Sequence, residues 1–235
     1  MKPSYKRILL KLSGESLMGQ EKFGYNQESV NKIVDEIKKV HELGVEIAIV
    51  VGGGNICRGK SLSNHGVDLA TADYMGMMAT IMNGLYLQDV LKNKGIDNRV
   101  MTAIAVNEVA EPFIRLKALK HLSKNRAVIL AAGTGNPFST TDTAAALKAK
   151  ELNCDLIIKA TKVDGIYDKD PKIAGAKKYD TLTYMEAITQ KLEVMDMTAF
   201  TMCNDFKIPI VVCDVMGLDN LAGIVQGKQI GTIVK

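Results

Sequence analysis

The sequence contains no tryptophan, and aromatic residues make up only 5% of its 235 positions. Because proteins that bind single-stranded nucleic acid stack bases on aromatic side chains, this composition argues against a nucleic-acid partner. No apolar segment approaches the length of a membrane span, and the N-terminus has no apolar signal region, so we expect no membrane partner. The four cysteines form no Cys-x-x-Cys pair and the three histidines are scattered, which argues against a zinc site and a disulfide framework. Reduced thiols indicate a cytoplasmic protein.

The remaining composition is that of an ordinary globular protein. Hydrophobic residues make up 47% of the chain and charged residues 24%, and the net charge is +4. A chain of this length can bury a substantial core, and neither a repeat nor a low-complexity linker divides it. We therefore expect a single domain over residues 1–235, in which an N-terminal part (about 1–126) and a C-terminal part (about 127–235) flank one active site.

Short apolar runs alternate with segments of helical periodicity from one end of the chain to the other. The predicted strands are Arg7–Leu12, Val45–Val51, Val100–Ile104, Ala127–Ala132, Leu156–Ala160, Pro209–Asp214 and Gly231–Val234. The predicted helices are one capped by Asn26 that runs to His41, then Asp68–Lys94, Pro112–Lys124, Thr141–Leu152, Thr183–Gln190, Asp196–Asp205 and Leu218–Val225. Met18–Tyr25 and Lys162–Lys178 are predicted to be loops. This alternation predicts an α/β fold, a three-layer α/β/α sandwich with a mostly parallel central sheet.

The most informative stretch is Ala127–Ala145. It opens with an apolar run, typical of a strand buried on both faces, and the run breaks at Gly133–Pro137. The polar residues Ser139–Asp142 follow and lead into helix formers. A glycine-lined, hydroxyl-rich turn between a buried strand and a helix N-terminus is where α/β proteins bind phosphate. The alternative is an ordinary strand–turn–helix connection with a threonine cap.

Gly54–Ser61 matches the P-loop pattern GxxxxGK[ST], and Asp73–Gly76 and Thr161–Asp164 match two further GTPase motifs. A P-loop lysine opens a helix at once, whereas the residues after Ser61 are poor helix formers. The aspartate of the second motif should end a hydrophobic strand, but Asp73 lies inside a segment with helical periodicity. We therefore predict a fold other than the P-loop fold and keep a P-loop GTPase only as a weak alternative.

Three strand ends carry small residues that let a ligand approach the backbone: Lys11–Gly14, Gly52–Asn55 and Gly133–Asp142. A fourth strand ends at Lys159-Ala160-Thr161. The sequence displays no recognisable nucleophile–base pair and no paired carboxylates. Phosphoryl transfer suits this pattern because it needs positioning and charge neutralisation more than covalent chemistry. An acceptor phosphate is already largely ionised near neutral pH, so such an enzyme needs no general base.

Taken together in order, these motifs resemble the amino acid kinase family, and within it the bacterial enzymes that phosphorylate UMP. The segments that carry the resemblance are Lys11–Glu15, Gly52–Asn55 with Arg58-Gly59, Asp73 with Met75–Met77, Gly133–Asp142, and Lys159–Gly165 with Tyr167 and Asp170-Pro171. The resemblance covers essentially the whole chain. It implies the reaction ATP + UMP → ADP + UDP in pyrimidine nucleotide biosynthesis, by direct transfer, with Mg²⁺ as cofactor.

The resemblance also assigns the candidate site residues by position. It assigns ATP to Lys11, Leu12, Ser13, Gly14, Gly54, Arg58, Thr161, Tyr167 and Asp170. It assigns UMP to Gly53, Asp73, Thr134, Gly135, Asn136, Pro137, Phe138, Ser139, Thr140 and Thr141. The catalytic residues would be Lys11 and Lys159, which neutralise the transferring phosphoryl group, and Asp142, which orients both lysines. No carboxylate stands out as a metal ligand, so the nucleotide phosphates would carry most of the Mg²⁺ coordination.

Regulation and assembly are further implications of the resemblance. Related enzymes are hexamers that GTP activates and UTP inhibits, and Gly19, Gln20, Glu21, Lys22, Phe23 and Gly24 match the loop associated with GTP activation. Met75–Leu91 has more apolar surface than one side of a sheet needs, which fits a subunit interface as well as plain core. Two alternatives stay open: another small-molecule kinase of the same fold, acting on carbamate, an amino acid or an isoprenoid phosphate, and a non-enzymatic sensor of uridine nucleotides.

Overall fold

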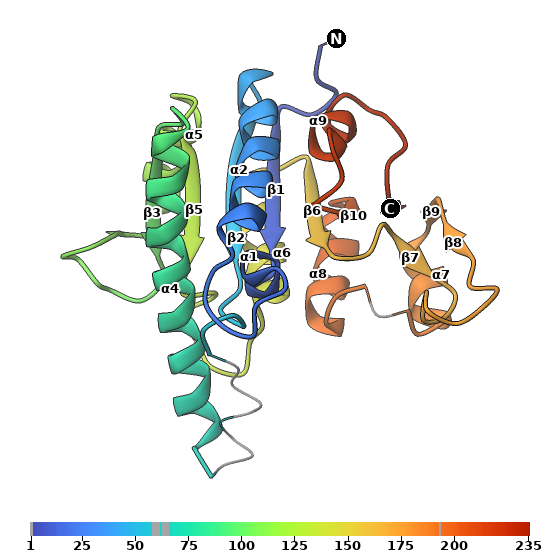
Figure 1. Cartoon of the computed structure of the whole chain (residues 1–235), viewed down its shortest axis with the longest axis horizontal. Helices are drawn as coiled ribbons and strands as arrows, with labels where there is room; N and C mark the ends of the chain where they lie inside the picture. The colour runs from blue at the N-terminus through green and yellow to red at the C-terminus, as the bar shows by residue number, and fades with distance from the viewer. Residues whose placement is uncertain (1, 58–61, 63–65, 193) are drawn as a thin grey trace.

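A nine-stranded sheet forms the middle layer of the molecule in this computed structural model, which describes residues 2–57, 62, 66–192 and 194–235 (Figure 1). The strand order is β4-β3-β5-β2-β1-β6-β10-β11-β9. The strands are β1 (Arg7–Leu12), β2 (Glu46–Val51), β3 (Asn98–Thr102), β4 (Glu111–Pro112), β5 (Ala127–Ala131), β6 (Leu156–Thr161), β9 (Thr181–Leu182), β10 (Ile210–Asp214) and β11 (Thr232–Val234). Neighbouring strands are parallel except β10 and β11, so the predicted mostly parallel sheet is confirmed.

Helices cover both faces of the sheet, which confirms the predicted three-layer sandwich. One face carries α2 (Gln27–Glu42), α4 (Leu69–Asn93) and α9 (Asn220–Val225), and the other carries α5 (Arg115–Leu122), α6 (Thr141–Glu151), α7 (Tyr184–Thr189) and α8 (Met197–Phe206). The central strands are apolar on both sides because both faces are buried. In β1, Ile8 and Leu10 face α2 and α4, whereas Leu9 faces α6.

Helix α4 extends beyond the carboxyl ends of the strands (Figure 1). Asp68 caps it by accepting a hydrogen bond from the backbone N–H of Thr71, as Asn26 caps α2. The prediction that Asp73 lies in a helix and not at a strand end is therefore confirmed. Within the described ranges, no helix combines the length and the apolarity that crossing a membrane requires.

Several elements differ from the sequence-based prediction, and four of these differences bear on the site or the sheet. The residues after β1 form a short helix, α1 (Gly14–Met18), because the Ser13 side chain caps it through the N–H of Ser16. Strand β3 begins two residues before the predicted Val100, since the side chain of Asn98 is buried and bonded to the carbonyls of Gln88 and Ile96. Pro112 belongs to the edge strand β4 and α5 starts only at Arg115. The predicted loop 162–178 contains part of a small hairpin, β7 (Ile166–Tyr167) with β8 (Lys178–Tyr179).

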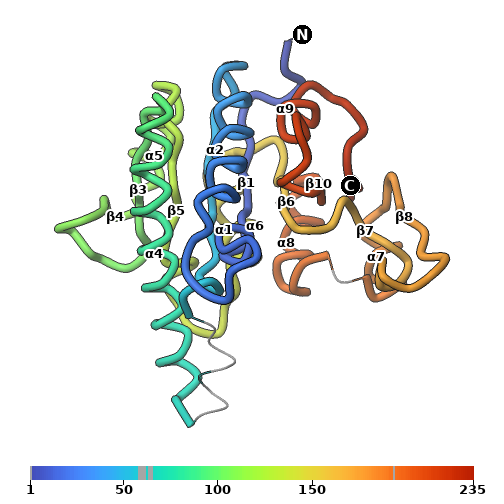
Figure 2. Tube along the Cα trace, viewed as in Figure 1, coloured from blue at the N-terminus to red at the C-terminus, as the bar shows by residue number. Residues whose placement is uncertain are grey.

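The two edges of the sheet differ in what they carry. The segment around β4 projects at one edge, and the β7–β8 hairpin lies with α7 toward the opposite edge (Figure 2). Between these edges, β5, β2, β1 and β6 end side by side. In a parallel sheet, this row of carboxyl ends is where ligands bind.

Candidate active site

Two lysines lie side by side near the carboxyl ends of β1 and β6. Lys11 and Lys159 occupy paired positions in the parallel register of these strands. Leu9 and Ile157, two residues earlier in each strand, belong to the core on the α6 side. Because side chains alternate along a strand, both lysines also point toward α6. The sheet register therefore brings together two cations that are 148 positions apart in the sequence.

Asp142, in the first turn of α6, bridges the two lysines. The Nζ atom of Lys11 lies 2.7 Å from Oδ1 of Asp142, and the Nζ atom of Lys159 lies 2.8 Å from Oδ2. The three side chains are only 11%, 13% and 17% exposed for Lys11, Asp142 and Lys159. Lys159 also donates to the backbone carbonyl of Val194. Two cations and one anion leave this cluster with a net positive charge, which suits the stabilisation of a phosphoryl group.

Burial and charge act against each other on Asp142. Burial by itself would raise the pKa of its carboxyl, but the charges and hydrogen bonds of Lys11 and Lys159 more than offset this and hold the pKa below its usual value. The pKa of Lys159 is also lowered, first by burial and then by the charge of Lys11, although Asp142 opposes the shift. Asp142 is therefore ionised at neutral pH, and Lys159 loses its proton more easily than an ordinary lysine.

The N-terminus of α6 is fixed by a second aspartate. The side chain of Thr140 caps the helix by accepting hydrogen bonds from the N–H groups of Asp142 and Thr143, at 3.0 and 3.3 Å. The hydroxyls of Thr140 and Thr143 donate to the carboxylate of Asp196, which itself caps α8. Asp196 thus ties the starts of two helices together and holds Asp142 in place.

The turn between β5 and α6, the acceptor turn (residues 132–141), folds against α4. Ala132 and Gly133 both have positive φ, of 62° and 57°, which turns the chain sharply at the end of the strand. The backbone N–H of Phe138 donates to Oδ2 of Asp73 at 2.7 Å. The turn and α4 enclose a cavity of about 130 Å³, whose lining includes Gly53, Asp73, Thr134, Asn136, Ser139, Thr140 and Thr141. Most residues assigned to UMP thus surround one small pocket.

The turn after β2, the donor turn (residues 52–55), contacts the start of α1. A Cβ atom on Gly14 would lie 2.6 Å from the backbone N of Gly54, and one on Gly53 would lie 2.7 Å from the carbonyl of Gly76 in α4. Only glycine permits these approaches. The structure therefore places Ser13 and Gly14 beside Gly54, all of which are assigned to ATP. Arg58, assigned to the same ligand, lies outside the described residues.

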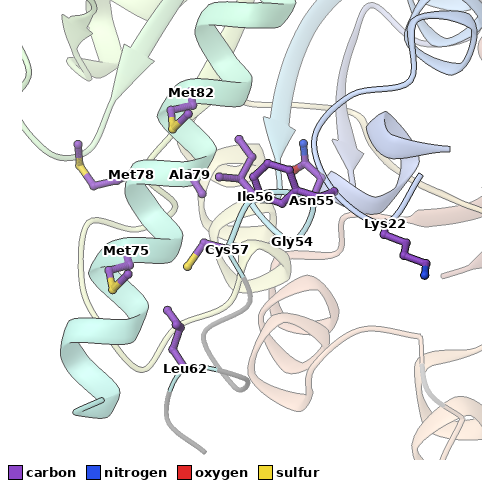
Figure 3. A pocket seen from close by; sticks show the side chains of 11 residues that line it. Lys22, Gly54, Asn55, Ile56, Cys57, Leu62, Met75, Met78, Ala79 and Met82 are labelled. Atoms are coloured by element: carbon purple, nitrogen blue, oxygen red, sulfur yellow. The ribbon is translucent and has the colours of Figure 1, made fainter. Parts of the chain in front are cut away.

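Loop 19–24, assigned to GTP, is hydrogen bonded to the donor turn. The N–H of Gly24 donates to the carbonyl of Asn55, and the side chain of Asn55 donates to the carbonyl of Gly24. An apolar cavity of about 570 Å³ lies between this loop, the donor turn and α4 (Figure 3). Its lining residues are Lys22, Phe23, Gly54, Asn55, Ile56, Cys57, Leu62, Met75, Met78, Ala79 and Met82.

The residues assigned to the adenosine of ATP are more exposed. The hydroxyl of Thr161 donates to the carbonyl of Val163 at the end of β6. Tyr167 donates to Asp164, which also pairs with Lys178 across the hairpin. Asp170 makes its hydrogen bond locally, to the N–H of Lys172. These contacts order the hairpin segment.

The comparisons with known proteins agree with this geometry. A model of the amino acid kinase family matches residues 6–214. The chain belongs to the amino acid kinase family. UMP kinase from Bacillus anthracis is similar over 98% of this chain and 96% of its own, with 40% identity and a TM-score of 0.96. UMP kinase from Ureaplasma parvum shares 34% identity over 98% of both chains, with a TM-score of 0.92. Uridylate kinase from Archaeoglobus fulgidus shares 29% identity over 97% of this chain and 99% of its own, with a TM-score of 0.74.

The sequence predicted no role in the site for four side chains that lie near it in this amino acid kinase fold. They are Asn55 as a side chain, Thr80, Asn83 and Asp196. Asp196 before an apolar helix is recognisable as a cap, but its bonds to α6 depend on tertiary contact. Thr80 and Asn83 lie inside a Met-rich helical segment, where a lone polar residue carries no signal of its own.

Proposed function

We propose that this protein transfers the γ-phosphoryl group of Mg·ATP to UMP, giving ADP and UDP. One observation carries the proposal: a single turn of α6 serves both halves of the site. Thr140 and Thr141 line the acceptor pocket, and the next residue, Asp142, holds Lys11 and Lys159. An acceptor bound in that pocket lies next to the cationic cluster. The similarity to three UMP and uridylate kinases supports UMP as the acceptor.

The proposed chemistry needs charge neutralisation and alignment. ATP would place its phosphates at Gly14 and Gly54, and its adenosine near Thr161 and Tyr167. Asp73 would accept hydrogen bonds from the ribose hydroxyls of UMP. Lys11 and Lys159 would stabilise the charge on the transferring phosphoryl group, while Asp142 keeps the two ammonium groups together. The UMP phosphate attacks directly, because it is already ionised and requires neither a general base nor a covalent intermediate.

The side chains near the phosphates fit a magnesium ion that arrives with the nucleotide. Both carboxylate oxygens of Asp142 are paired with lysines, and the described part of the chain has no group of three or more His, Cys, Asp or Glu that could hold a metal. The phosphates would therefore supply most ligands, as Mg²⁺ commonly requires. When bound, the ion would add positive charge to the nucleotide phosphates.

A substrate panel tests the proposal. We expect ADP release from Mg·ATP with UMP, much less with CMP, and essentially none with AMP or GMP. The small acceptor pocket of about 130 Å³ disfavours the larger purine nucleotides, and the preference for UMP over CMP rests on the similarity to UMP kinases. Equal rates with all four would refute UMP specificity. Turnover only with carbamate, an amino acid or an isoprenoid phosphate would favour another kinase of this fold. UMP binding without turnover at saturating Mg·ATP would favour a nucleotide sensor.

The variant Lys11→Ala tests the mechanism. It removes one of the two cations, so we expect kcat to fall by about 100-fold or more, the effect of losing one transition-state contact. Lys94→Ala is the matched control, because Lys94 also forms a lysine–aspartate pair, with Asp35, but at the far end of α4. Circular dichroism should show both variants folded. Full activity in Lys11→Ala would remove Lys11 from the mechanism.

Regulation is part of the same proposal. GTP would activate through loop 19–24, UTP would inhibit, and the enzyme would be a homohexamer. Two features support this: the loop is bonded to the donor turn through Asn55, and Met75, Met78 and Met82 on α4 are 44%, 47% and 54% exposed. Light scattering during size-exclusion chromatography would measure the assembly, and rates with added GTP or UTP would measure the regulation.

A further inference from the structure

We propose that Thr80 and Asn83 of α4 are positioning residues that fix the two halves of the site separately. Thr80 holds the acceptor turn, and Asn83 holds the donor turn. Both side chains are buried, at 3% and 0% exposure. They lie three positions apart, and on a helix this spacing places side chains on the same face. The kinetic part of this inference rests on the proposed function, whereas its structural part does not.

Thr80 acts at the end of β5. The backbone N–H of Ala132 donates to Oγ1 of Thr80 at 2.7 Å, and the hydroxyl donates in turn to the carbonyl of Met77. Ala132 has φ of +62°, a conformation that costs a non-glycine residue energy. The hydrogen bond to Thr80 occupies the N–H at this strained point. It therefore stabilises the reversal that directs Gly133 and Thr134 toward the acceptor pocket.

Asn83 acts at the end of β2 through a pair of amides. Its Nδ2 donates to the carbonyl of Gly52 and to Oδ1 of Asn55, both at 2.7 Å. The Nδ2 of Asn55 donates back to Oδ1 of Asn83 at 3.1 Å and to the carbonyl of Gly24 at 3.0 Å. All four amide hydrogens of this buried pair are used, and such satisfied networks specify one arrangement. The pair fixes the donor turn against α4 and loop 19–24.

The backbone of α4 reinforces both anchors. Gly53 approaches the helix so closely that a Cβ atom would lie 2.7 Å from the carbonyl of Gly76. At Gly84, a Cβ atom would contact the side chain of Ala131, 3.5 Å away at the end of β5. The same helix thus contacts the donor turn itself and the end of the strand before the acceptor turn. We infer that α4 sets the separation of the two turns, and hence of the two nucleotides.

The test compares variants that each remove one anchor. Thr80→Val keeps the branched shape and removes the hydroxyl, and Thr80→Ser keeps the hydroxyl as a rescue. Asn83→Asp keeps the shape and removes the two donors. The measurements are KM for UMP and ATP, equilibrium binding of UMP and of a non-hydrolysable ATP analogue, and amide hydrogen exchange at residues 52–55 and 132–135.

We expect Thr80→Val to weaken UMP about fivefold to tenfold, the effect of one lost hydrogen bond, and to leave ATP within about twofold. Exchange should rise at residues 132–135 only, and Thr80→Ser should restore both values. Asn83→Asp should weaken ATP more than UMP, although Gly53 of the donor turn also lines the acceptor pocket, and exchange should rise at residues 52–55 only. If Asn83→Asp does not fold, Asn83→Ser, which keeps one donor, should give the same pattern more weakly.

Equal weakening of both nucleotides by each variant, or no change in either, would overturn the inference. Exchange that rises equally in both turns would also overturn it, because α4 would then act as a general support. The test is separate from the proposed function. If the wild-type protein binds nucleotides without turnover, the binding data decide the inference, and if it binds neither, the exchange pattern decides it.

Discussion

Two of the aspartates that pair with lysine in this molecule, Asp142 and Asp164, lie in opposite surroundings. Asp142 lies between Lys11 and Lys159 and is 13% exposed, whereas Asp164 on the hairpin segment pairs with Lys178 and is 58% exposed. The pKa of each carboxyl is below its usual value. For Asp164 the hydrogen bond from Tyr167 is the main cause. For Asp142 the largest effect is burial, which raises the pKa and which the two lysines must overcome.

The difference lies in what each pair depends on. The Asp164 contacts join residues 3 and 14 positions apart within one small hairpin, in water that screens their charges. The Asp142 contacts join β1, β6 and α6, and their geometry exists only when the sheet register and the start of α6 are both formed. The buried cluster is therefore a product of the whole fold, and of these two pairs it is the one in which removal of one charge should have a large effect.

Asp142→Asn should have the largest effect. It leaves two buried ammonium groups adjacent without a counter-charge, and breaking a buried pair in this way costs about 3–5 kcal/mol. We expect kcat to fall by about 100-fold or more, since the lysines lose their alignment, and the free energy of unfolding to fall as well. Steady-state rates and urea denaturation measure the two effects. Unchanged rate and stability would show that the buried cluster does not differ from an exposed pair.

The pH dependence of kcat and of stability tests whether the buried Lys159 behaves differently from an exposed lysine. Its pKa is lowered, so kcat should fall with rising pH below the range in which ordinary lysines titrate. Stability should change in the opposite direction. Because the unfolded chain binds this proton more tightly than the folded protein, a rise in pH between the folded and unfolded pKa values of Lys159 increases the stability that this group contributes.

Lys159→Arg tests whether the fall of kcat at alkaline pH is caused by loss of the Lys159 proton. Arginine remains charged at alkaline pH, so the alkaline decline of kcat should move upward, even if kcat itself decreases because the guanidinium is larger. Rates measured over a pH series for the two proteins decide the point. An alkaline decline at the same pH in both would assign it to another group.

Much of the fold was predictable because buried parallel strands are short apolar runs. β1, β2 and β5 were found in this way, and the glycine turns after them indicated phosphate chemistry. Lys11 and Lys159 could each be placed near a strand end. Their pairing could not be derived from local patterns, because it depends on the register between β1 and β6, which strands distant in sequence adopt only in the folded sheet.

The early start of β3 and the missed roles of Thr80 and Asn83 have a common physical cause. Asn98 begins β3 because the carbonyls of Gln88 and Ile96 accept both hydrogens of its buried amide nitrogen, although asparagine is rare in strands. Thr80 and Asn83 lie on the buried face of α4, where polar residues are unexpected unless strand ends supply their partners. In both cases, a buried polar side chain is explained only by backbone groups from another element. Sequence periodicity records where apolar residues lie, but not which polar groups meet.

Asp164→Asn should have the smallest effect and is the exposed counterpart of Asp142→Asn. The change removes the charge facing Lys178 but leaves an oxygen that can still accept from Tyr167, so the hairpin contact is largely kept. Because exposed ion pairs contribute only about 0–1 kcal/mol, we expect little change in the free energy of unfolding and less than about a threefold change in KM for ATP. The same assays as for Asp142→Asn measure both. A large loss of ATP affinity with unchanged stability would mean that Asp164 contacts the nucleotide, and the two aspartates would then differ in their ligand rather than in their burial.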